Sequence, residues 1–539
     1  MDNRDWIVIG ILFAVSFFFW TLPLQDNHLP FSEHDGAYIF SYGDHITYLG
    51  RTMNLIGDTP PSLGGWYAGY NILLGPRGIV YPPAYNIDYS LMQIFGGERI
   101  VPVFLFIAFT SILGCISMYV VMRKLFGFLP AILTAIPLMF SFREIMSYLW
   151  GQRHNTFAFV FIPLTAYSLY MALAAFYGDE KKKHLAYLWL YMLLLASSSL
   201  AHFSATAFLV IYSLIVIAFF FIAYRKLPAL PSLWKQYLAM LGVFFFLTWM
   251  MYPIYFSGLG GDSGENPSVM AVATLFTWID RPANNFGLNP AFSEYATSYP
   301  GYWTIGLLMV GIALLLFSKG TKKYFLLSGM VALYLVYHFP FFGLSTPDNY
   351  RIARFMMIEP YFFYAIMGVA IASLPRFIPL AKRGQQVASY ALAIAFLAVV
   401  ISTQGMQAYA TLEQSYDGIS RITPAQMELA SWIESNVPAA EGVNILGTIS
   451  YPKWRWIQIL SRHYATQSYE HIGRYETVAE VKGWEPINST FTHVAFDYSD
   501  LAAMGRADQI QQLQQLESQA AQNASIVYQT QLIRVYRYG

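Results

Sequence analysis

Apolar runs of about 20 residues recur along the first three quarters of the chain, from Trp6 to Ile401, with short polar breaks between them. Each run is long enough to cross a hydrocarbon layer about 30 Å thick as a helix that rises 1.5 Å per residue. The pattern therefore predicts a membrane protein with eleven spanning helices. The predicted spans lie near residues 6–24, 99–121, 128–147, 156–177, 185–201, 203–224, 236–256, 301–318, 324–342, 355–374 and 387–404.

Lysines mark alternate breaks between these spans. Short loops that carry Lys and Arg normally stay in the cytoplasm. If the N-terminus is cytoplasmic, every lysine before residue 405 falls on the cytoplasmic side. These are Lys124, Lys181, Lys182, Lys183, Lys226, Lys235, Lys319, Lys322, Lys323 and Lys382. An odd number of spans then places the tail outside, together with the long loop 25–98.

The pattern changes after residue 404, where apolar runs shorten to strand length and polar residues return. Thr423 and Gln426 with Pro424 between them predict the capped start of an amphipathic helix through residue 432. Alternation predicts strands at 443–450, 492–498, 525–530 and 532–538, and a helix over 506–521. We therefore expect a mainly α polytopic membrane domain over 1–404, including outer loop 25–98, and an extracytoplasmic α/β domain over 405–539.

Composition narrows the class of protein. Of the 539 residues, 56% are apolar and 12% are charged, against about 25% charged in soluble domains. Net charge is +1, so no basic excess suggests a nucleic-acid partner. The single cysteine, Cys115, allows no disulfide within the chain. These values exclude a soluble enzyme, a disordered protein and a secreted disulfide scaffold.

Side chains that could take part in catalysis or binding are concentrated in the loop 25–98. Asp35 and Asp44 lie there beside imidazoles such as His45, with aromatic residues such as Trp66 and Tyr81 further along. Carboxylates, imidazoles and aromatic rings at this density, just beyond a first span, predict a polar pocket at the membrane face. The alternative for each carboxylate taken singly is a solvated loop residue that caps a helix.

At these residues the sequence resembles the GT-C superfamily of membrane glycosyltransferases. The resemblance rests on the Asp/His pair after the first span, on Trp-Tyr-x-Gly-Tyr at 66–70 and on Tyr-Pro-Pro at 81–83. Further short matches are Trp-Gly-Gln-Arg at 150–153, Leu-Ala-His at 200–202 and the segment 351–355. The most similar members are the prokaryotic membrane proteins labelled 6-pyruvoyl-tetrahydropterin-synthase-related. The resemblance covers nearly the whole chain, and its individual motifs are short.

The resemblance implies a sugar donor carried on a polyprenyl phosphate or diphosphate, and an acidic residue in the first outer loop as catalytic base or metal ligand. Asp44 matches that residue best and Asp35 is the alternative. His45 directly follows Asp44, whereas the family places its His a few residues further on, so the choice between the two carboxylates stays open. The location implied is the plasma membrane of a prokaryote.

The chemistry of sugar transfer also favours these residue types. A carboxylate can accept the proton of the attacking hydroxyl as an oxocarbenium-like transition state forms. The departing lipid phosphate needs cationic donors, which Arg supplies through its planar fork. Arg351 and Arg354 are three residues apart and share a helix face; the alternative for them is contact with lipid headgroups. Further expected substrate-binding residues are Arg153, His202, Trp66 and Tyr81.

No zinc-type spacing occurs in the sequence. If a metal binds, Asp35 and Asp44 favour a hard ion such as Mg²⁺ or Mn²⁺. The expected partners are membrane lipid, a polyprenyl-phosphate-linked sugar donor, and a glycan, lipid or protein acceptor. A second class, a lipid or glycan transporter, needs charges deep in the membrane, whereas Glu144 and Glu359 lie near the outer ends of spans. A third is a non-catalytic cell-envelope assembly protein.

Overall fold

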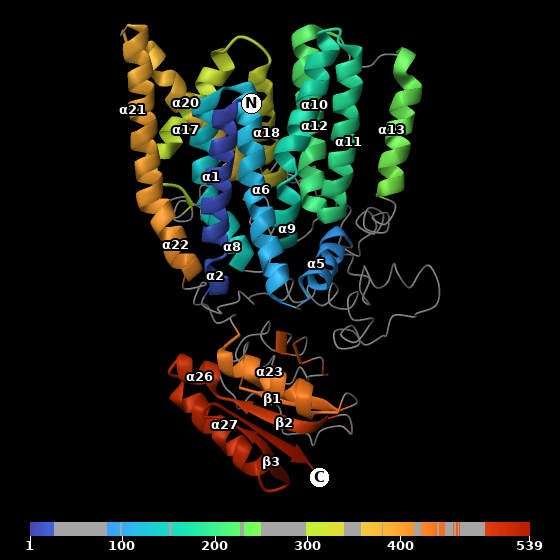
Figure 1. Cartoon of the computed structure of the whole chain (residues 1–539), viewed down its shortest axis with the longest axis vertical. Coiled ribbons are helices and arrows are strands. Elements are labelled where there is room, and N and C mark those ends of the chain that lie inside the picture. The colour runs from blue at the N-terminus through green and yellow to red at the C-terminus, as the bar shows by residue number, and fades with distance from the viewer. Residues whose placement is uncertain are drawn as a thin grey trace.

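The computed structural model describes residues 1–25, 83–97, 100–149, 153–226, 231–248, 298–338, 357–379, 381–413, 422–438, 441–447, 456–457, 460–461, 463 and 491–538. Long apolar helices run side by side in a bundle, and a small sheet domain lies beyond one end of it (Figure 1). The predicted class, a mainly α membrane protein with a C-terminal α/β domain, is confirmed.

Each of the eleven predicted spans contains a helix. In chain order the helices of the bundle and its ends are α1 (Asn3–Trp20), α2 (Leu22–Gln25), α5 (Pro83–Gly96), α6 (Val101–Leu125), α7 (Phe128–Met139), α8 (Phe142–Leu149), α9 (Arg153–Phe159), α10 (Ile162–Tyr177), α11 (Lys181–Ala201), α12 (Phe203–Tyr224), α13 (Trp234–Leu247), α17 (Trp303–Phe317), α18 (Lys322–His338), α20 (Glu359–Ser373), α21 (Lys382–Val400) and α22 (Met406–Glu413). By length and composition, seven helical stretches among the described residues can cross a membrane, and α13 and α17 are shorter apolar helices.

Some helices differ from the predicted spans in detail. The third span is broken at Phe140 and Ser141 into α7 and α8, and the fourth is broken near Val160 into α9 and α10. A π-helical turn, Ile401–Gly405, joins α21 to α22, so the last helix of the bundle runs on to Glu413 rather than ending at 404. Within the loop 25–98, α5 is an additional helix that the hydrophobic pattern did not indicate.

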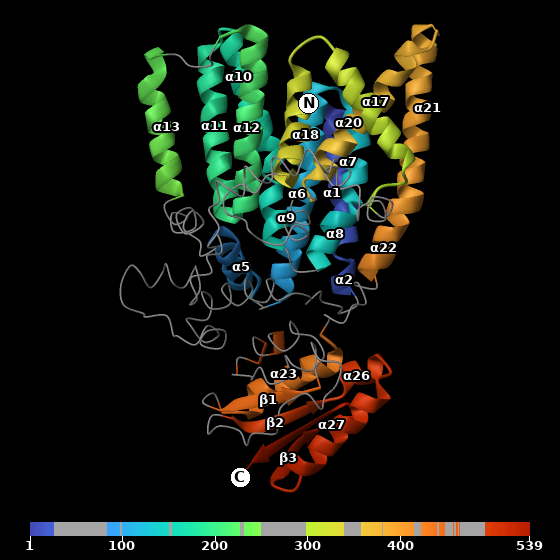
Figure 2. The ribbon, with the colours of Figure 1, turned by 180° about the vertical axis from the view of Figure 1, so that it is seen from behind.

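The lysines mark one end of the bundle. The turn between α10 and α11, the turn between α17 and α18, and the start of α21 all lie at the end where the N-terminus lies (Figures 1 and 2). All ten lysines before residue 405 lie in or beside the chain breaks at this end, which we call the lysine end. The other end, where α1 finishes and α20 begins, faces the sheet domain, and we call it the domain end.

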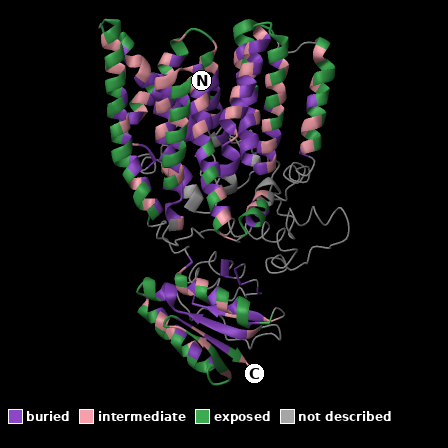
Figure 3. Cartoon of the chain, viewed as in Figure 1, coloured by how far each residue is buried: buried purple, intermediate pink, exposed green. Residues whose placement is uncertain are grey.

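Helix α20 forms the centre of the bundle. Twelve of its fifteen residues are buried, and burial is concentrated in the middle helices while α13 and α21 are largely exposed (Figure 3). Glycines let neighbouring helices approach α20 closely: a Cβ on Gly311 of α17 would lie 2.5 Å from Ile366, and one on Gly329 of α18 would lie 2.0 Å from Phe362. Small residues at such contacts are typical of helix packing in membranes, where close approach maximises dispersion contacts.

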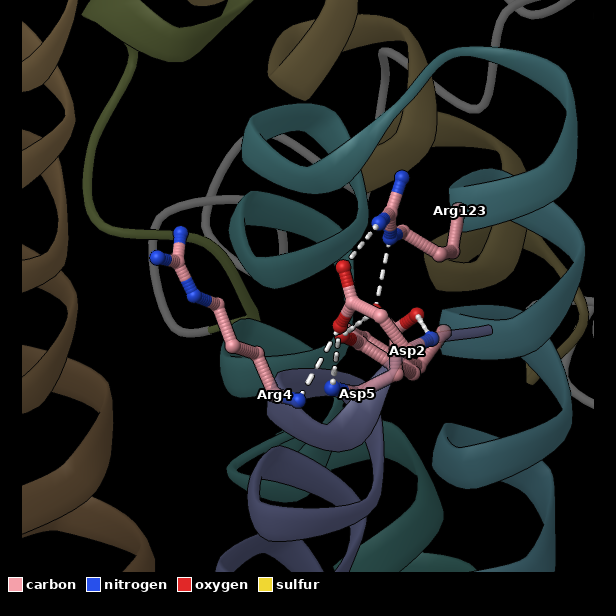
Figure 4. A network of polar contacts seen from close by, with 5 residues as sticks. Asp2, Arg4, Asp5 and Arg123 are labelled. Carbon is pink, nitrogen blue, oxygen red and sulfur yellow. Dashed lines mark hydrogen bonds and ion pairs between the residues drawn. The ribbon is translucent and has the colours of Figure 1, made fainter.

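A buried ion pair joins α1 to α6 at the lysine end (Figure 4). Asp2 caps α1 in a capping box with Asp5, and its side chain accepts hydrogen bonds from the backbone N–H groups of Arg4 and Asp5. The Asp5 carboxylate is fully buried and accepts hydrogen bonds from Arg123 Nε at 2.6 Å and from the Tyr119 hydroxyl at 2.9 Å. The pair therefore fixes the register of the first helix against α6.

The C-terminal domain is built on a four-stranded sheet of order β1-β2-β4-β3. The strands are β1 (Gly442–Leu446), β2 (Phe491–Asp497), β3 (Ala524–Gln529) and β4 (Ile533–Tyr538), with β1 parallel to β2 and the other pairs antiparallel. The bounds of β2, β3 and β4 agree with the predicted strands to within one residue, whereas β1 ends at Leu446 and the predicted strand ran to residue 450. The helices α23 (Pro424–Asn436) and α27 (Ala507–Ala520) also lie where they were predicted, and a short helix, α26 (Ser499–Ala503), follows β2.

Two helices cover opposite faces of this sheet. Trp432 of α23 stacks on Tyr528 with ring centroids 5.0 Å apart, and Gln426 donates a hydrogen bond to Asp497 at 2.7 Å. On the other face, Glu517 of α27 accepts hydrogen bonds from Tyr498, Arg534 and Tyr536. The predicted capping box at Thr423 is present, with both reciprocal hydrogen bonds to Gln426.

Candidate functional site

A break in the third span sets up a polar cluster at the domain end. Pro137 lies inside α7 and cannot donate a backbone hydrogen bond, and α7 ends two residues later at Met139. The chain resumes as α8 at Phe142, so Arg143 and Glu144 lie in the first turn of a new helix. There they meet the first turn of α20.

Arg143 and Glu359 form a buried ion pair. Arg143 Nη1 lies 2.8 Å from Glu359 Oε1, and both side chains are 8% exposed. Tyr299 donates its hydroxyl to the same Glu359 oxygen at 2.8 Å, and the Arg143 guanidinium lies over the Tyr299 ring at 5.5 Å. Arg143 Nε also donates to Ser298 Oγ at 3.2 Å. These contacts join three segments, namely α8, α20 and the residues just before α17.

A second carboxylate lies beside this pair. Glu144 is 4% exposed and is hydrogen-bonded by the Tyr361 hydroxyl, while its Oε1 atom has no hydrogen-bond partner among the described residues. Gly114 of α6 makes room for Tyr361, because a Cβ there would lie 2.3 Å from the hydroxyl oxygen. The first turns of α8 and α20 are thus joined by two adjacent polar contacts, Arg143 with Glu359 and Glu144 with Tyr361.

The cluster concentrates ionisable groups where apolar burial makes them costly. A charge removed from water without a partner loses several kcal/mol of solvation, so a buried pair persists only with good geometry. The cluster offers two carboxylates and one guanidinium, and a guanidinium can bind oxyanions such as phosphate. Among the described residues, this is the part of the bundle's domain end where acid and base side chains meet across helices.

Most residues predicted from the sequence as site residues lie outside the described residues. These are Asp35, Asp44, His45, Trp66, Tyr81, Arg351 and Arg354. Arg153 begins α9, whose backbone is described and which packs against α11 and α12. The structure therefore brings the helix that starts at Arg153 to the two helices that meet at His202.

His202 lies between α11 and α12 and is buried. Its Nδ1 atom accepts a hydrogen bond from the backbone N–H of Ser204 at 3.1 Å, so His202 caps α12. An accepting Nδ1 requires the neutral ring to carry its proton on Nε2. Thr206 donates to Ser199 at 3.0 Å beside it and joins the two helices. Substrate binding by His202 stays a prediction.

Asp88 is a carboxylate in the loop 25–98 that was not among the predicted site residues. It lies on α5 and is half-buried, and this burial raises the pKa of its carboxyl from 3.8 to about 6. A carboxyl with a pKa near the working pH exchanges a proton readily, as a general base must. The position of Asp88 in the sequence could have indicated it, because this carboxylate follows Tyr-Pro-Pro and lies within an apolar helical stretch.

Among the described residues no three His, Cys, Asp or Glu side chains are grouped as a metal site. The two predicted metal ligands, Asp35 and Asp44, lie outside those residues, so the expectation of Mg²⁺ or Mn²⁺ stays untested. Arg143 was also missed. The sequence signal that could have indicated it is Glu359, which carries the opposite charge and lies near the end of another span, so that the two could form an ion pair.

No protein-family model matches the sequence, and no curated protein matches it. Solved structures with the same fold include ArnT from Cupriavidus metallidurans bound to undecaprenyl phosphate, with 12% identity, a TM-score of 0.50, and 99% of this chain aligned to 98% of that one. The apo state of ArnT gives a TM-score of 0.52 at 11% identity.

The archaeal oligosaccharyltransferase AglB from Archaeoglobus fulgidus, solved with an inhibitory peptide and a dolichol-phosphate, has a TM-score of 0.52 at 10% identity. Its alignment covers 92% of this chain and 70% of AglB. At these identities the likeness establishes the fold alone, which the chain shares with ArnT and AglB.

Proposed function

We propose that the chain is an integral-membrane glycosyltransferase that moves a sugar from a polyprenyl-phosphate-type donor to an acceptor at the outer membrane face. The observation that carries this proposal is the likeness, over 99% of the chain, to a structure bound to undecaprenyl phosphate. AglB, which has the same fold, was solved with a dolichol-phosphate. Two proteins that share this fold therefore hold the phosphate of a long isoprenoid.

The finer parts of the proposal come from the sequence. The N-terminus is cytoplasmic, the sheet domain is extracytoplasmic, and the membrane is the plasma membrane of a prokaryote. The chain is grouped with the prokaryotic membrane proteins labelled 6-pyruvoyl-tetrahydropterin-synthase-related. The sugar is a hexose or a pentose. Any metal would be Mg²⁺ or Mn²⁺ held by Asp35 and Asp44.

In the proposed reaction Asp44, or else Asp35, accepts the proton of the acceptor hydroxyl while that oxygen forms a bond to the anomeric carbon. The bond between that carbon and the phosphate oxygen breaks, and the lipid phosphate leaves with the electron pair. Arg351 and Arg354 stabilise its negative charge. The buried Arg143–Glu359 pair supports this role indirectly, because it fixes the start of α20, five residues after Arg354.

The test uses the full chain in nanodiscs with undecaprenyl-phosphate and dolichyl-phosphate donors that carry a labelled hexose or pentose. Bacterial membrane extract serves as acceptor, and loss of label from the donor is measured. A general base contributes about 10²–10⁴-fold, so Asp44→Asn should lose that factor. Asp35→Asn is the comparison within the loop, and Asp508→Asn, an exposed residue of α27, is the control.

If Asp35→Asn lowers the transfer rate by that factor and Asp44→Asn changes it little, Asp35 is the general base in place of Asp44. The assignment as an enzyme then still holds. Full turnover in both variants would show that neither Asp35 nor Asp44 acts as the general base. A wild-type chain that carries labelled lipid across the bilayer without cleaving any donor would be a transporter, and the proposal would be wrong.

A further inference from the structure

Helix α5 is amphipathic, and among the described residues its apolar face is exposed. Tyr89, Ser90 and Gln93 are buried on the side that packs against α6 and α11. The opposite side exposes Leu91 at 39%, Ile94 at 59% and Phe95 at 78%. These three are spaced as one helix face. Asp88 is the one Asp, Glu, Lys, Arg or His residue of the helix.

A tight contact fixes where this face lies. A Cβ on Gly96 would lie 2.2 Å from Cγ of Pro102 at the start of α6. Only glycine permits that approach, so the C-terminal end of α5 is held against the first turn of α6. Figure 1 shows α5 inclined beside the domain end of the bundle, level with the ends of α6 and α8.

The exposed face of α5 continues a surface that already faces lipid. Along α6, a candidate membrane span, Val101, Leu105, Phe109 and Leu113 are exposed at successive four-residue steps. Such a ridge on a spanning helix contacts acyl chains. Phe95 lies six residues before Val101 and immediately before the Gly96–Pro102 contact, so the apolar ridge of α6 leads onto α5.

We propose that α5 is an interfacial helix whose Leu91, Ile94 and Phe95 enter the boundary between headgroups and acyl chains of the bilayer at the domain end. A helix with an apolar face and few charges lies in that layer with its apolar side about 5–10 Å into it. The partner is the phospholipid bilayer itself. This holds whether or not the chain transfers sugars.

The consequence concerns the loop 25–98. Because α1 crosses the membrane and α5 is anchored at residues 83–96 of the loop, the part of the loop before α5 begins and ends at the level of the headgroups. The phosphate of any lipid substrate lies at that same level. Leu91, Ile94 and Phe95 are thus positioning residues for the loop, through their contact with lipid.

The test measures depth by spin labelling of the full chain in phosphatidylcholine nanodiscs. In a Cys115→Ala background, Leu91→Cys and Phe95→Cys each carry a nitroxide, and collision rates with oxygen and with a polar nickel chelate are compared. Leu193→Cys, on the exposed side of α11, is the reference for acyl chains, and Gln511→Cys, on α27, is the reference for water.

We expect the oxygen-to-nickel ratio at both α5 positions to lie nearer that of Leu193 than that of Gln511. A ratio like that of Gln511 at either position would overturn the proposal. Low collision rates with both reagents would also overturn it, since they would mean that protein covers the face. As a second measurement, Gly96→Val should shift the ratio at Leu91, because it separates α5 from α6; an unchanged ratio would contradict the anchoring by Gly96.

Discussion

At the residue scale, two ion pairs join helices of the bundle. Asp5 pairs with Arg123 at the lysine end, and Arg143 pairs with Glu359 at the domain end. In each case the pair joins helices far apart in the sequence. A buried pair contributes little beyond what apolar residues of the same volume would, yet removing one partner leaves an uncompensated charge.

This asymmetry makes a prediction for Arg143 and Glu359. Glu359→Leu should lower the free energy of unfolding by about 3–5 kcal/mol, because it leaves the guanidinium buried without its carboxylate. The double variant Arg143→Met with Glu359→Leu should recover most of that loss. Unfolding in a mixed-micelle titration measures both variants.

The control for this cycle is the exposed pair of Glu180 and Lys183 at the lysine end. Glu180→Gln should change the free energy of unfolding by less than about 1 kcal/mol, since water screens the pair. Equal losses in Glu180→Gln and Glu359→Leu would show that burial does not determine the cost.

Asp88 gives a prediction about pH. Burial raises its pKa to about 6 from 3.8, so the folded state holds this proton more tightly than the unfolded state. The contribution of Asp88 to the free energy of unfolding is therefore fully present below about pH 4, and it is lost as the pH rises through about 6. Asp88→Asn should gain roughly 1–2 kcal/mol over wild type at pH 7.5, after allowance for partial exposure.

Thermal unfolding of both proteins at pH 4 and at pH 7.5 measures this difference. The gain of the Asn variant should be present at pH 7.5 and nearly absent at pH 4. A gain of the same size at both values would show that the substitution acts through packing and not through the proton.

At this scale the sequence predicted a side-chain contact only where the two partners are close together in the chain. The capping box at Thr423 was predicted because its two partners are three residues apart. The Arg143–Glu359 pair was not, since its members are separated by more than two hundred residues and no local pattern links them. His202 was predicted as a substrate-binding residue, and the contact that the structure shows is the local one of a helix cap.

At the scale of helices and strands, hydrophobic periodicity predicted most of the fold. Apolar runs predicted a helix in every span because a chain in lipid must satisfy its backbone groups internally. Alternation predicted the four strands because successive side chains of a strand point to opposite faces of the sheet. The breaks inside the third and fourth spans were missed, since a break between two apolar helices leaves the apolar pattern unchanged.

Glycine packing around α20 leads to a prediction at this scale. Gly311→Ala should destabilise the bundle by about 1–3 kcal/mol, because its Cβ would lie 2.6 Å from the carbonyl oxygen of Ile366, which cannot move aside. Gly306→Ala on the same helix meets nothing within 4 Å, so it should be neutral or stabilise by about 0.5–1 kcal/mol. Similar losses from both would contradict this explanation, because Gly306→Ala introduces no close contact.

At the scale of the whole molecule, the lysine end and the domain end should lie on opposite sides of the membrane. In a Cys115→Ala background, Lys182→Cys and Gln511→Cys should react oppositely with a membrane-impermeant maleimide applied to intact cells. Gln511→Cys should label from outside, and Lys182→Cys should label only after the cells are opened. Labelling of Lys182→Cys in intact cells would reverse the proposed orientation.

The central place of α20 constrains the order in which the molecule can assemble. Helix α6 is complete at Leu125, yet α20, which fills the space beside Gly114, begins only at Glu359. At roughly 5–20 residues per second of synthesis, tens of seconds separate the two. Throughout that interval Arg143 and Glu144 have emerged without Glu359 and Tyr361. The nascent bundle must therefore hold an unfilled centre with uncompensated charge until its tenth span enters. A chain stopped before residue 359 would present that centre to lipid and to quality-control proteases.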